Sequence, residues 1–374
     1  MENSMQRKAY LVLENGRVFE GKSFGYPSES TGELVFTTAM TGYLETLTDP
    51  SYYGQIVIQT FPLIGNYGII PEDFESEKPY LKGYVVRQWC QEPSNFRSEG
   101  DLDSFLYEHK IPGIYDIDTR ALTRIVREHG VMNAKICLSY PDMEAVLNEL
   151  KDYRIVDAVA SVSKGKQVST GPSDADFRVV LWDFGAKGNI ERMLLKRGCR
   201  VITVPCFAKA EEILALEPDG LMLSNGPGDP AENTESIVQI KKVVERNIPT
   251  FGICLGHQLL ALARGAKTEK LKYGHRGANQ PVIERTTGRV YITSQNHGYA
   301  VVSSTLPANS FESYTNANDG TCEGVRYTDI PAFSVQFHPE ACGGPLDTGF
   351  LFDEFINLMR SSAGKGGKTD AAQK

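Results

Sequence analysis

The residues best suited to catalysis are Cys254 and its neighbours in FGICLGHQLL, 251–260. A short apolar run precedes the cysteine and a helix-like run follows it, which is typical of a sharp strand-to-helix turn that carries a nucleophile. Such a turn requires small neighbours, and Gly252 and Gly256 meet that need. The helix N-terminus favours a thiolate, and the backbone N–H of Leu255 can stabilise an oxyanion. A structural cysteine at a strand end is the alternative, and the two glycines favour the nucleophile.

A cysteine nucleophile needs a base, and the segment SVQFHPE, 334–340, supplies one at the end of a predicted strand. His338 can take the thiol proton and return it to the leaving amine. Glu340 can hold the imidazole in the required tautomer, as the acid of a Ser-His-Asp triad does. Pro339 disfavours helix at His338 and stiffens the turn. The alternative interpretation is an ordinary polar strand end.

Two other histidines compete for the role of base. His257 follows Cys254 at helical spacing, so we expect it on the helix behind the nucleophile, packed or hydrogen-bonded. His297, in SQNHGYAV, is predicted to lie on a loop near strands. His338 therefore stays the preferred base.

The loop NGPGDP, 225–230, follows the predicted strand 220–224. The next predicted strand, 250–253, leads to Cys254. Its two glycines and two prolines make a rigid loop that allows close approach, and its backbone N–H groups could complete an oxyanion hole. A plain turn is the alternative, because Gly-Pro sequences form turns in many proteins. The neighbouring cysteine turn favours a functional loop.

The order of elements from residue 177 onward predicts a doubly wound α/β domain. Apolar runs of strand length alternate with helix-like segments, as in a mainly parallel sheet that helices cover on both faces. The predicted strands are 177–182, 200–204, 220–224 and 250–253, and the predicted helices are 186–197, 209–216, 234–246 and 255–264. After Gly265 the sequence predicts further strands and a last helix over 349–359.

The first 160 residues have a mixed α/β pattern. Two short strands flank an Asn15-Gly16 turn, and helices are predicted over 102–109, 119–129 and 142–150. The polar stretch 161–176 predicts a linker. The expected organisation is a mixed α/β domain over 1–160, the linker, the doubly wound domain over 177–362, and a polar tail over 363–374 that is predicted to be disordered.

Composition narrows the functional classes. A length of 374 residues predicts two domains, and a net charge of −8 argues against general nucleic-acid binding. The sequence has neither a signal-like N-terminus nor an apolar run of about 18 residues, so no membrane span is expected. The seven cysteines form no C-x-x-C pair and no metal-ligand spacing. We therefore expect reduced thiols, no metal site and a cytoplasmic location.

The order NGPGDP, GICLGHQ, QNHG and HPE resembles the class I glutamine amidotransferases over residues 177–360. In the first domain, TGYLETLTDPSYYGQIV (41–57) and GIYDIDTRALTR (113–124) resemble the N-terminal domain of carbamoyl-phosphate synthetase small subunits. FPLIGNYG (61–68) and DFGAKGNI (183–190) are similar to the same family. The resemblance spans nearly the whole chain.

The resemblance implies a role for each matching position. Cys254 is the nucleophile, His338 and Glu340 support it, and the oxyanion donors are the backbone amides of Leu255 and Gly226. Leu255 also falls among the substrate-binding positions, and the residues that would hold glutamine are Ser51, Gly226, Gly228, Gln258, Asn296, Gly298 and Tyr299. Ser51 comes from the first domain, so the site would lie partly at the interface. Tyr299 stands where an aromatic such as Phe is usual, and Cys342 receives no role.

The residue types and the family resemblance both predict hydrolysis of an amide, and the resemblance implies that the amide is L-glutamine. Cys254 attacks the side-chain amide, a γ-glutamyl thioester and ammonia result, and water then releases glutamate. The resemblance implies a large partner subunit that binds ATP, bicarbonate and Mg²⁺ and uses the ammonia to make carbamoyl phosphate for arginine and pyrimidine biosynthesis. The present chain is expected to bind no cofactor, and to work slowly without the partner.

Three alternatives stay open. The first is another enzyme, either an amidotransferase of a different synthetase or a free-standing amide hydrolase, and the first domain argues against both. The second is a degenerate amidotransferase that only binds a partner, which the presence of Cys254 disfavours. The third is a cysteine peptidase, which the narrow glycine loops disfavour because they suit a small amide.

Overall fold

Seven strands of the first domain close into a barrel in the order β1-β2-β8-β6-β4-β3-β9. The computed structural model describes residues 7–362. The barrel strands are β1 (Lys8–Leu13), β2 (Val18–Gly25), β3 (Ser30–Thr37), β4 (Gln55–Gln59), β6 (Gly83–Val85), β8 (Pro112–Tyr115) and β9 (Met132–Cys137). Pairs β3–β4, β4–β6 and β6–β8 are parallel and the other pairs are antiparallel. Closure removes the exposed edges that a flat sheet would have.

Helices and short elements surround this barrel. They are α1 (Tyr43–Thr48), α2 (Leu102–Glu108), α3 (Thr119–His129), α4 (Met143–Asp152), the 3₁₀ helices η1 (Pro50–Tyr52) and η2 (Pro71–Asp73), and the strand pair β5 (Leu63–Ile64) and β7 (Gln88–Trp89). The three helices predicted in this domain are present. Helix α3 begins where the Asp118 carboxylate accepts the N–H of Ala121 and ends at Gly130, whose φ is 94°.

The second domain is built on a ten-stranded sheet in the order β10-β12-β11-β13-β14-β19-β18-β16-β15-β17. Its strands are β10 (Val168–Thr170), β11 (Phe177–Asp183), β12 (Cys199–Pro205), β13 (Gly220–Leu223), β14 (Thr250–Ile253), β15 (Thr268–Glu284), β16 (Val290–Val301), β17 (Ser310–Asn316), β18 (Cys322–Tyr327) and β19 (Ala332–Val335). The five strands from β12 to β19 in this order are parallel, and the pairs beyond them are antiparallel.

Helices cover both faces of this sheet. They are α5 (Ala158–Val162), α6 (Gly188–Leu195), α7 (Ala210–Ala215), α8 (Thr234–Val244), α9 (Leu255–Ala263) and α10 (Phe350–Ser362), with η3 (Pro230–Glu232) and η4 (Ser303–Thr305) in connections. Buried side chains of α7, α8 and α9 form one core, and those of α6 and α10 form the other. The predicted fold class, a mixed α/β domain followed by a doubly wound domain, is confirmed. No helix within residues 7–362 is long and apolar enough to cross a membrane.

Two segments differ from the sequence-based expectation. The predicted linker, 161–176, contains β10, which pairs antiparallel with β12 at the edge of the sheet. Its polar residues suit an exposed edge strand, so they resembled a linker. His297 lies inside the long strand β16 and not on a loop. Both sides of β16 carry buried polar groups there, which hides the usual alternation. The predicted tail, 363–374, lies outside the described residues.

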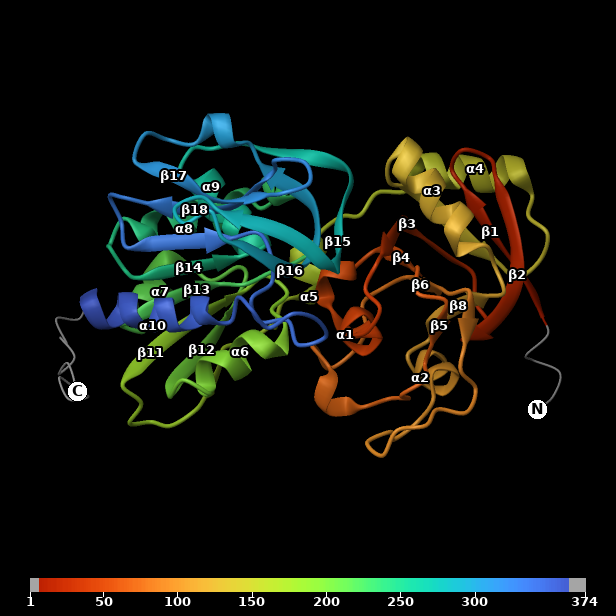
Figure 1. The fold of residues 1–374 in the computed structure, drawn as a ribbon, viewed down its shortest axis with the longest axis horizontal. Helices are drawn as coiled ribbons and strands as arrows, with labels where there is room; N and C mark the ends of the chain where they lie inside the picture. The colour runs from red at the N-terminus through yellow and green to blue at the C-terminus, as the bar shows by residue number, and fades with distance from the viewer. Residues whose placement is uncertain (1–6, 363–374) are drawn as a thin grey trace.

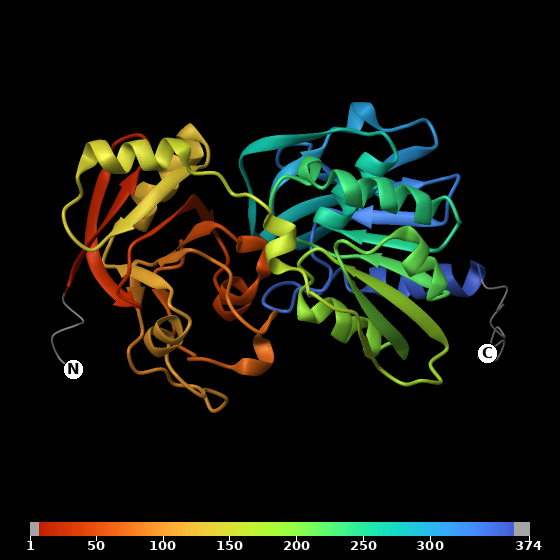
Figure 2. The same cartoon turned by 180° about the vertical axis from the view of Figure 1, so that it is seen from behind.

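The two domains lie side by side, and the chain crosses between them from α4 to α5 (Figures 1 and 2). Glu75 of the first domain sits at the N-terminus of α6. Its carbonyl accepts the N–H of Gly188 at 2.7 Å, and its carboxylate accepts the N–H of Asn189 at 3.0 Å. On β15, the carbonyl of Arg276 accepts the N–H of Thr38 at 3.2 Å. These bonds fix the interface at which the candidate site lies.

Candidate active site

Cys254 occupies the turn between β14 and α9 in a strained conformation. Its φ is 53°, a value that a side chain other than glycine rarely adopts, and the residue is 2% exposed. Its N–H donates to the carbonyl of Val335 at 2.9 Å, which ties the turn to β19. A Cβ on Gly252 would lie 2.8 Å from the carbonyl oxygen of Gly256, and a Cβ on Gly256 would overlap the carbonyl of Leu223. The two glycines are therefore needed for the turn.

His338 and Glu340 follow β19 and meet next to the turn. The Nδ1 atom of His338 lies 2.6 Å from Oε1 of Glu340, and both residues are buried. This contact assigns the proton to Nδ1. The Nε2 atom has no hydrogen-bond partner within residues 7–362, so it is free to exchange a proton with a thiol. The arrangement can therefore generate a thiolate and carry its proton.

Electrostatics favour a charged base in this position. Burial and the neighbouring Lys187 ammonium lower the pKa of His338, but the Glu340 carboxylate and the Cys254 thiolate outweigh them and raise it above its usual range. Burial raises the pKa of Glu340, whereas His338 and Lys187 bring it down to about 2. The acid is therefore ionised and the imidazole is stabilised as its cation.

Lys187 was missed as a functional residue by the sequence reasoning. Its Nζ lies 3.4 Å from Oε1 of Glu340, 3.6 Å from Oδ2 of Asp49 and 3.2 Å from Nδ1 of His338. When Nδ1 carries a proton the last contact cannot be a hydrogen bond, so Glu340 is the shared acceptor. Burial lowers the pKa of Lys187, but Asp49, Glu340 and Glu75 raise it overall. The only signal was its place in DFGAKGNI.

The NGPGDP loop reaches the nucleophile. A Cβ on Gly226 would lie 2.8 Å from Cδ2 of Leu255, so the two residues predicted to supply oxyanion donors are in contact. Gly228 has a φ of 88°, which only glycine adopts readily. The Nδ2 of Asn225 donates to Oγ of Ser51 at 3.0 Å, which brings the first domain to the loop.

Most of the predicted substrate residues line one cavity of about 550 Å³. Its wall includes Ser51, Gly226, Gly228, Cys254, Gln258, Asn296, Gly298 and Tyr299. Leu255 and Glu340 do not line it, and His338 lines a second cavity of about 70 Å³ together with Lys187 and Asp49. The Nε2 of Gln258 donates to the carbonyl of Tyr299 at 2.8 Å, so this side chain also fixes the substrate strand.

Each of the two competing histidines is held by other protein groups. His257 is fully buried, its Nδ1 lies 2.8 Å from Oγ of Ser334, and burial lowers its pKa to about 3. It is a packed, neutral residue, as expected. His297 has its Nδ1 2.8 Å from the carbonyl of Tyr299, which keeps the imidazole against its own strand.

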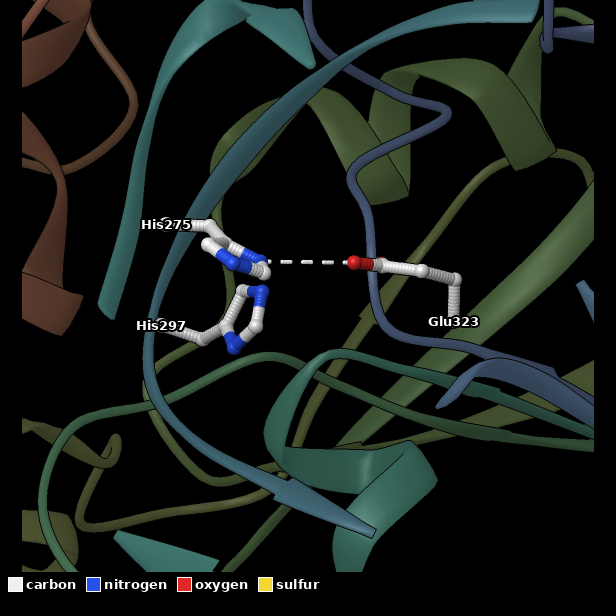
Figure 3. A group of neighbouring side chains, drawn as sticks. All are labelled: His275, His297 and Glu323. Atoms are coloured by element: carbon white, nitrogen blue, oxygen red, sulfur yellow. Dashed lines mark ion pairs between the residues drawn. The ribbon is translucent and has the colours of Figure 1, made fainter. Parts of the chain in front are cut away.

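A buried group of His275, His297 and Glu323 has the composition of a metal site, with ligand atoms within 4.8 Å of one another (Figure 3). Protein partners already occupy these groups. The Nε2 of His275 lies 2.8 Å from Asp319, and the amide of Asn316 donates to Glu323 at 2.9 Å. Burial lowers the pKa of His275, but Glu323 and Asp319 raise it overall. The imidazole of His275 is thus held between Asp319 and Glu323, and we assign the group to support of β16.

Sequence comparisons agree with this geometry. The sequence model of the carbamoyl-phosphate synthase small chain, CPSase domain, matches residues 11–136. A "Carbamoyl phosphate synthase small chain" of Clostridium perfringens is 53% identical, over 93% of this chain and 99% of its own. This chain belongs to the carbamoyl phosphate synthase small-chain family. The small-chain family resemblance predicted from the motifs is thereby confirmed.

Further members of the small-chain family match to a similar extent. A "Carbamoyl phosphate synthase small chain" of Oceanobacillus iheyensis is 52% identical over 96% of this chain and 98% of its own. A "Carbamoyl phosphate synthase pyrimidine-specific small chain" of Halalkalibacterium halodurans is 51% identical over 95% and 98%. The class-I glutamine amidotransferase model matches residues 180–358, which contain Cys254, His338 and Glu340.

Replacing Lys187 with Met tests the importance of the buried ammonium. We expect a loss of about 3–5 kcal/mol in the free energy of unfolding, because the variant leaves the carboxylates of Asp49 and Glu340 buried without their cation. Urea denaturation followed by circular dichroism measures the change. Lys242→Met is the control, because Lys242 forms an exposed ion pair with Glu211 and should change stability little. Equal stabilities of the two variants would contradict the proposed charge balance.

Proposed function

We propose that this chain is the glutamine-hydrolysing subunit of a carbamoyl-phosphate synthase. The observation that carries the proposal is a thiol on a strained turn next to a buried His338–Glu340 pair, with the thiol on the wall of a cavity. The family membership supports the same activity. The substrate is L-glutamine, and the products are glutamate and ammonia.

The catalytic cycle uses residues within reach of the cavity. His338 accepts the proton of Cys254, and the thiolate attacks the amide carbon of glutamine. The backbone N–H groups of Leu255 and Gly226 stabilise the oxyanion of the tetrahedral intermediate. His338 returns the proton to the leaving nitrogen, so ammonia departs and a γ-glutamyl thioester stays on Cys254. His338 then deprotonates a water molecule that hydrolyses the thioester, and glutamate leaves.

The substrate contacts are proposed on the same basis. Ser51, Gly228, Gln258, Asn296, Gly298 and Tyr299 lie on the cavity wall together with Cys254 and Gly226. Ser51 belongs to the first domain, so a complete site requires both domains in place. The amide of Asn296 donates to Asp49 at 2.9 Å, which links the substrate strand to the segment that carries Ser51.

The released ammonia is used only if a second substrate that accepts it is bound nearby. We assign that role to a large subunit that binds ATP, Mg²⁺ and bicarbonate and forms carbamoyl phosphate, and we propose that the present chain binds no cofactor itself. The relatives are named small chains, which supports a larger partner. We place the complex in the cytoplasm and its product in pyrimidine and arginine biosynthesis; one relative is named pyrimidine-specific.

A subunit that only binds a partner is the main rival. Partner binding alone does not require a strained cysteine beside an ionised His338–Glu340 pair. The strained backbone lowers the free energy of unfolding by about 1–3 kcal/mol. Retention of the strain therefore favours catalysis. A peptidase is disfavoured because the thiol is 2% exposed and lies inside a cavity rather than along an open groove.

Glutaminase assays of wild type and Cys254→Ser, with and without the large subunit, test the proposal. We expect hydrolysis to fall by at least about 1000-fold in the variant, because a serine hydroxyl is far less acidic than a thiol and His338, which is stabilised as its cation, activates it poorly. The wild-type rate should rise with the large subunit. Cys90→Ser is the control for loss of a thiol remote from the cavity and should keep wild-type activity. Hydrolysis that survives in Cys254→Ser would return the binding-only subunit as the better interpretation.

The pH profile tests the role of Glu340. In Glu340→Gln the pKa of His338 should fall, because the carboxylate that raises it is gone. Activity at high pH depends on the imidazolium, so the alkaline limb of kcat/KM should move to lower pH, and kcat should drop by about 100-fold. Glu232→Gln, which removes an exposed carboxylate from the cavity rim, is the control and should leave the limb in place. An unmoved limb in Glu340→Gln would exclude this coupling.

A further inference from the structure

Three basic side chains line the cavity of Cys254, namely Arg154, Lys270 and Arg276. Arg154 is exposed and donates to two backbone carbonyls. Lys270 is half exposed and pairs with Glu33 at 2.9 Å. Only Arg276 is buried, with 5% of its surface exposed. It is therefore the one cation of the cavity wall, within the described residues, that is shielded from water.

The guanidinium of Arg276 has few protein partners. Its Nη1 donates to the carbonyl of Tyr273 at 2.7 Å, whereas its Nε has no hydrogen-bond partner within residues 7–362. No ion pair between Arg276 and a carboxylate forms in that part of the chain. Glu33 and the Cys254 thiolate act on it only through their charge, and Glu33 already binds Lys270 and Gln55. A buried cation with unsatisfied donors is costly unless an anion joins it.

The strand register aims Arg276 at the substrate positions. Arg276 on β15 lies opposite Asn296 on β16, so the two side chains share a face of the sheet. A Cβ on Gly298 would lie 3.4 Å from Nη2 of Arg276, which puts the guanidinium against the substrate strand. The next pair, His275 and His297, occupies the other face with Glu323 (Figure 3). The alternation of the strands therefore places Arg276 on the face of Asn296 and opposite to that of His275 and His297.

We propose that Arg276 binds the α-carboxylate of the glutamine substrate. The inference rests on the proposed function, since it assigns a further contact to the same substrate. Glutamine carries its reacting amide at one end and its carboxylate beyond the γ, β and α carbons. An arginine binds a carboxylate through two parallel N–H donors, and in a buried site this interaction is strong. The contact would select free α-amino acid amides over amides that lack the carboxylate.

Kinetics with two substrates separate this role from others. The substrates are glutamine and 4-aminobutanamide, which is glutamine without its α-carboxylate. In Arg276→Met we expect KM for glutamine to rise by about 100-fold with kcat within about threefold of wild type, because a contact equal in ground and transition states is lost. The kcat/KM for 4-aminobutanamide should change by less than about threefold. Arg276→Lys, which keeps the charge but not the two-pronged donor, should raise KM for glutamine by about tenfold.

The control variant is Lys270→Met, which removes an exposed and already paired cation from the same wall and should leave KM within about twofold. Alkylation of Cys254 by iodoacetamide, a neutral reagent, reports whether each variant keeps a folded site, and Arg276→Lys decides the matter if Arg276→Met does not fold. An unchanged KM for glutamine, or an equal loss with both substrates, would overturn the inference. Absence of glutamine hydrolysis by the wild type would instead count against the proposed function.

Discussion

One buried ammonium group governs the arrangement of the site. Lys187 lies at the start of α6 and faces Asp49 of the first domain and Glu340 of the second, at 3.6 and 3.4 Å. Charges this far from water are tolerated only as a complete set, because any one left alone would cost several kcal/mol. The Lys187 ammonium therefore needs both carboxylates. Asp49 is supplied when the two domains dock, and Glu340 must be ionised. Glu340 in turn fixes the imidazole of His338 at 2.6 Å, so the state of the base depends on how the domains meet.

The second requirement is steric. Cys254 reaches the cavity only because the chain reverses between β14 and α9 without a Cβ at Gly252 or Gly256. The parallel strands place this turn, the NGPGDP loop and the segment after β19 at the same edge of the sheet, where open α/β sheets bind ligands. The antiparallel strands β15 and β16 then close one side of the cavity. The catalytic groups thus follow parallel strands of the sheet, whereas Asn296, Gly298 and Tyr299 come from its antiparallel part.

Features that depend on residues close together in the sequence could be predicted from the sequence. The glycines around Cys254, the His338–Glu340 pair and the alternation of strands and helices from 177 to 264 were all predictable. Lys187 was not, because its partners Asp49 and Glu340 are distant in sequence, Asp49 belongs to the other domain, and no spacing rule connects them. The closed barrel depends on pairings between distant strands, such as β1 with β9. The edge strand β10 and the polar part of β16 could not be predicted as strands from hydrophobic periodicity, because neither alternates apolar with polar residues.

The central claim is that Cys254 carries the γ-glutamyl group during turnover. Mass spectrometry of the enzyme, quenched in acid while it hydrolyses glutamine, tests it most directly. We expect a γ-glutamyl adduct on the peptide that contains Cys254, present only while glutamine lasts and absent from the other cysteine peptides. Steady hydrolysis without any adduct on Cys254, or with an adduct on another residue, would contradict the account.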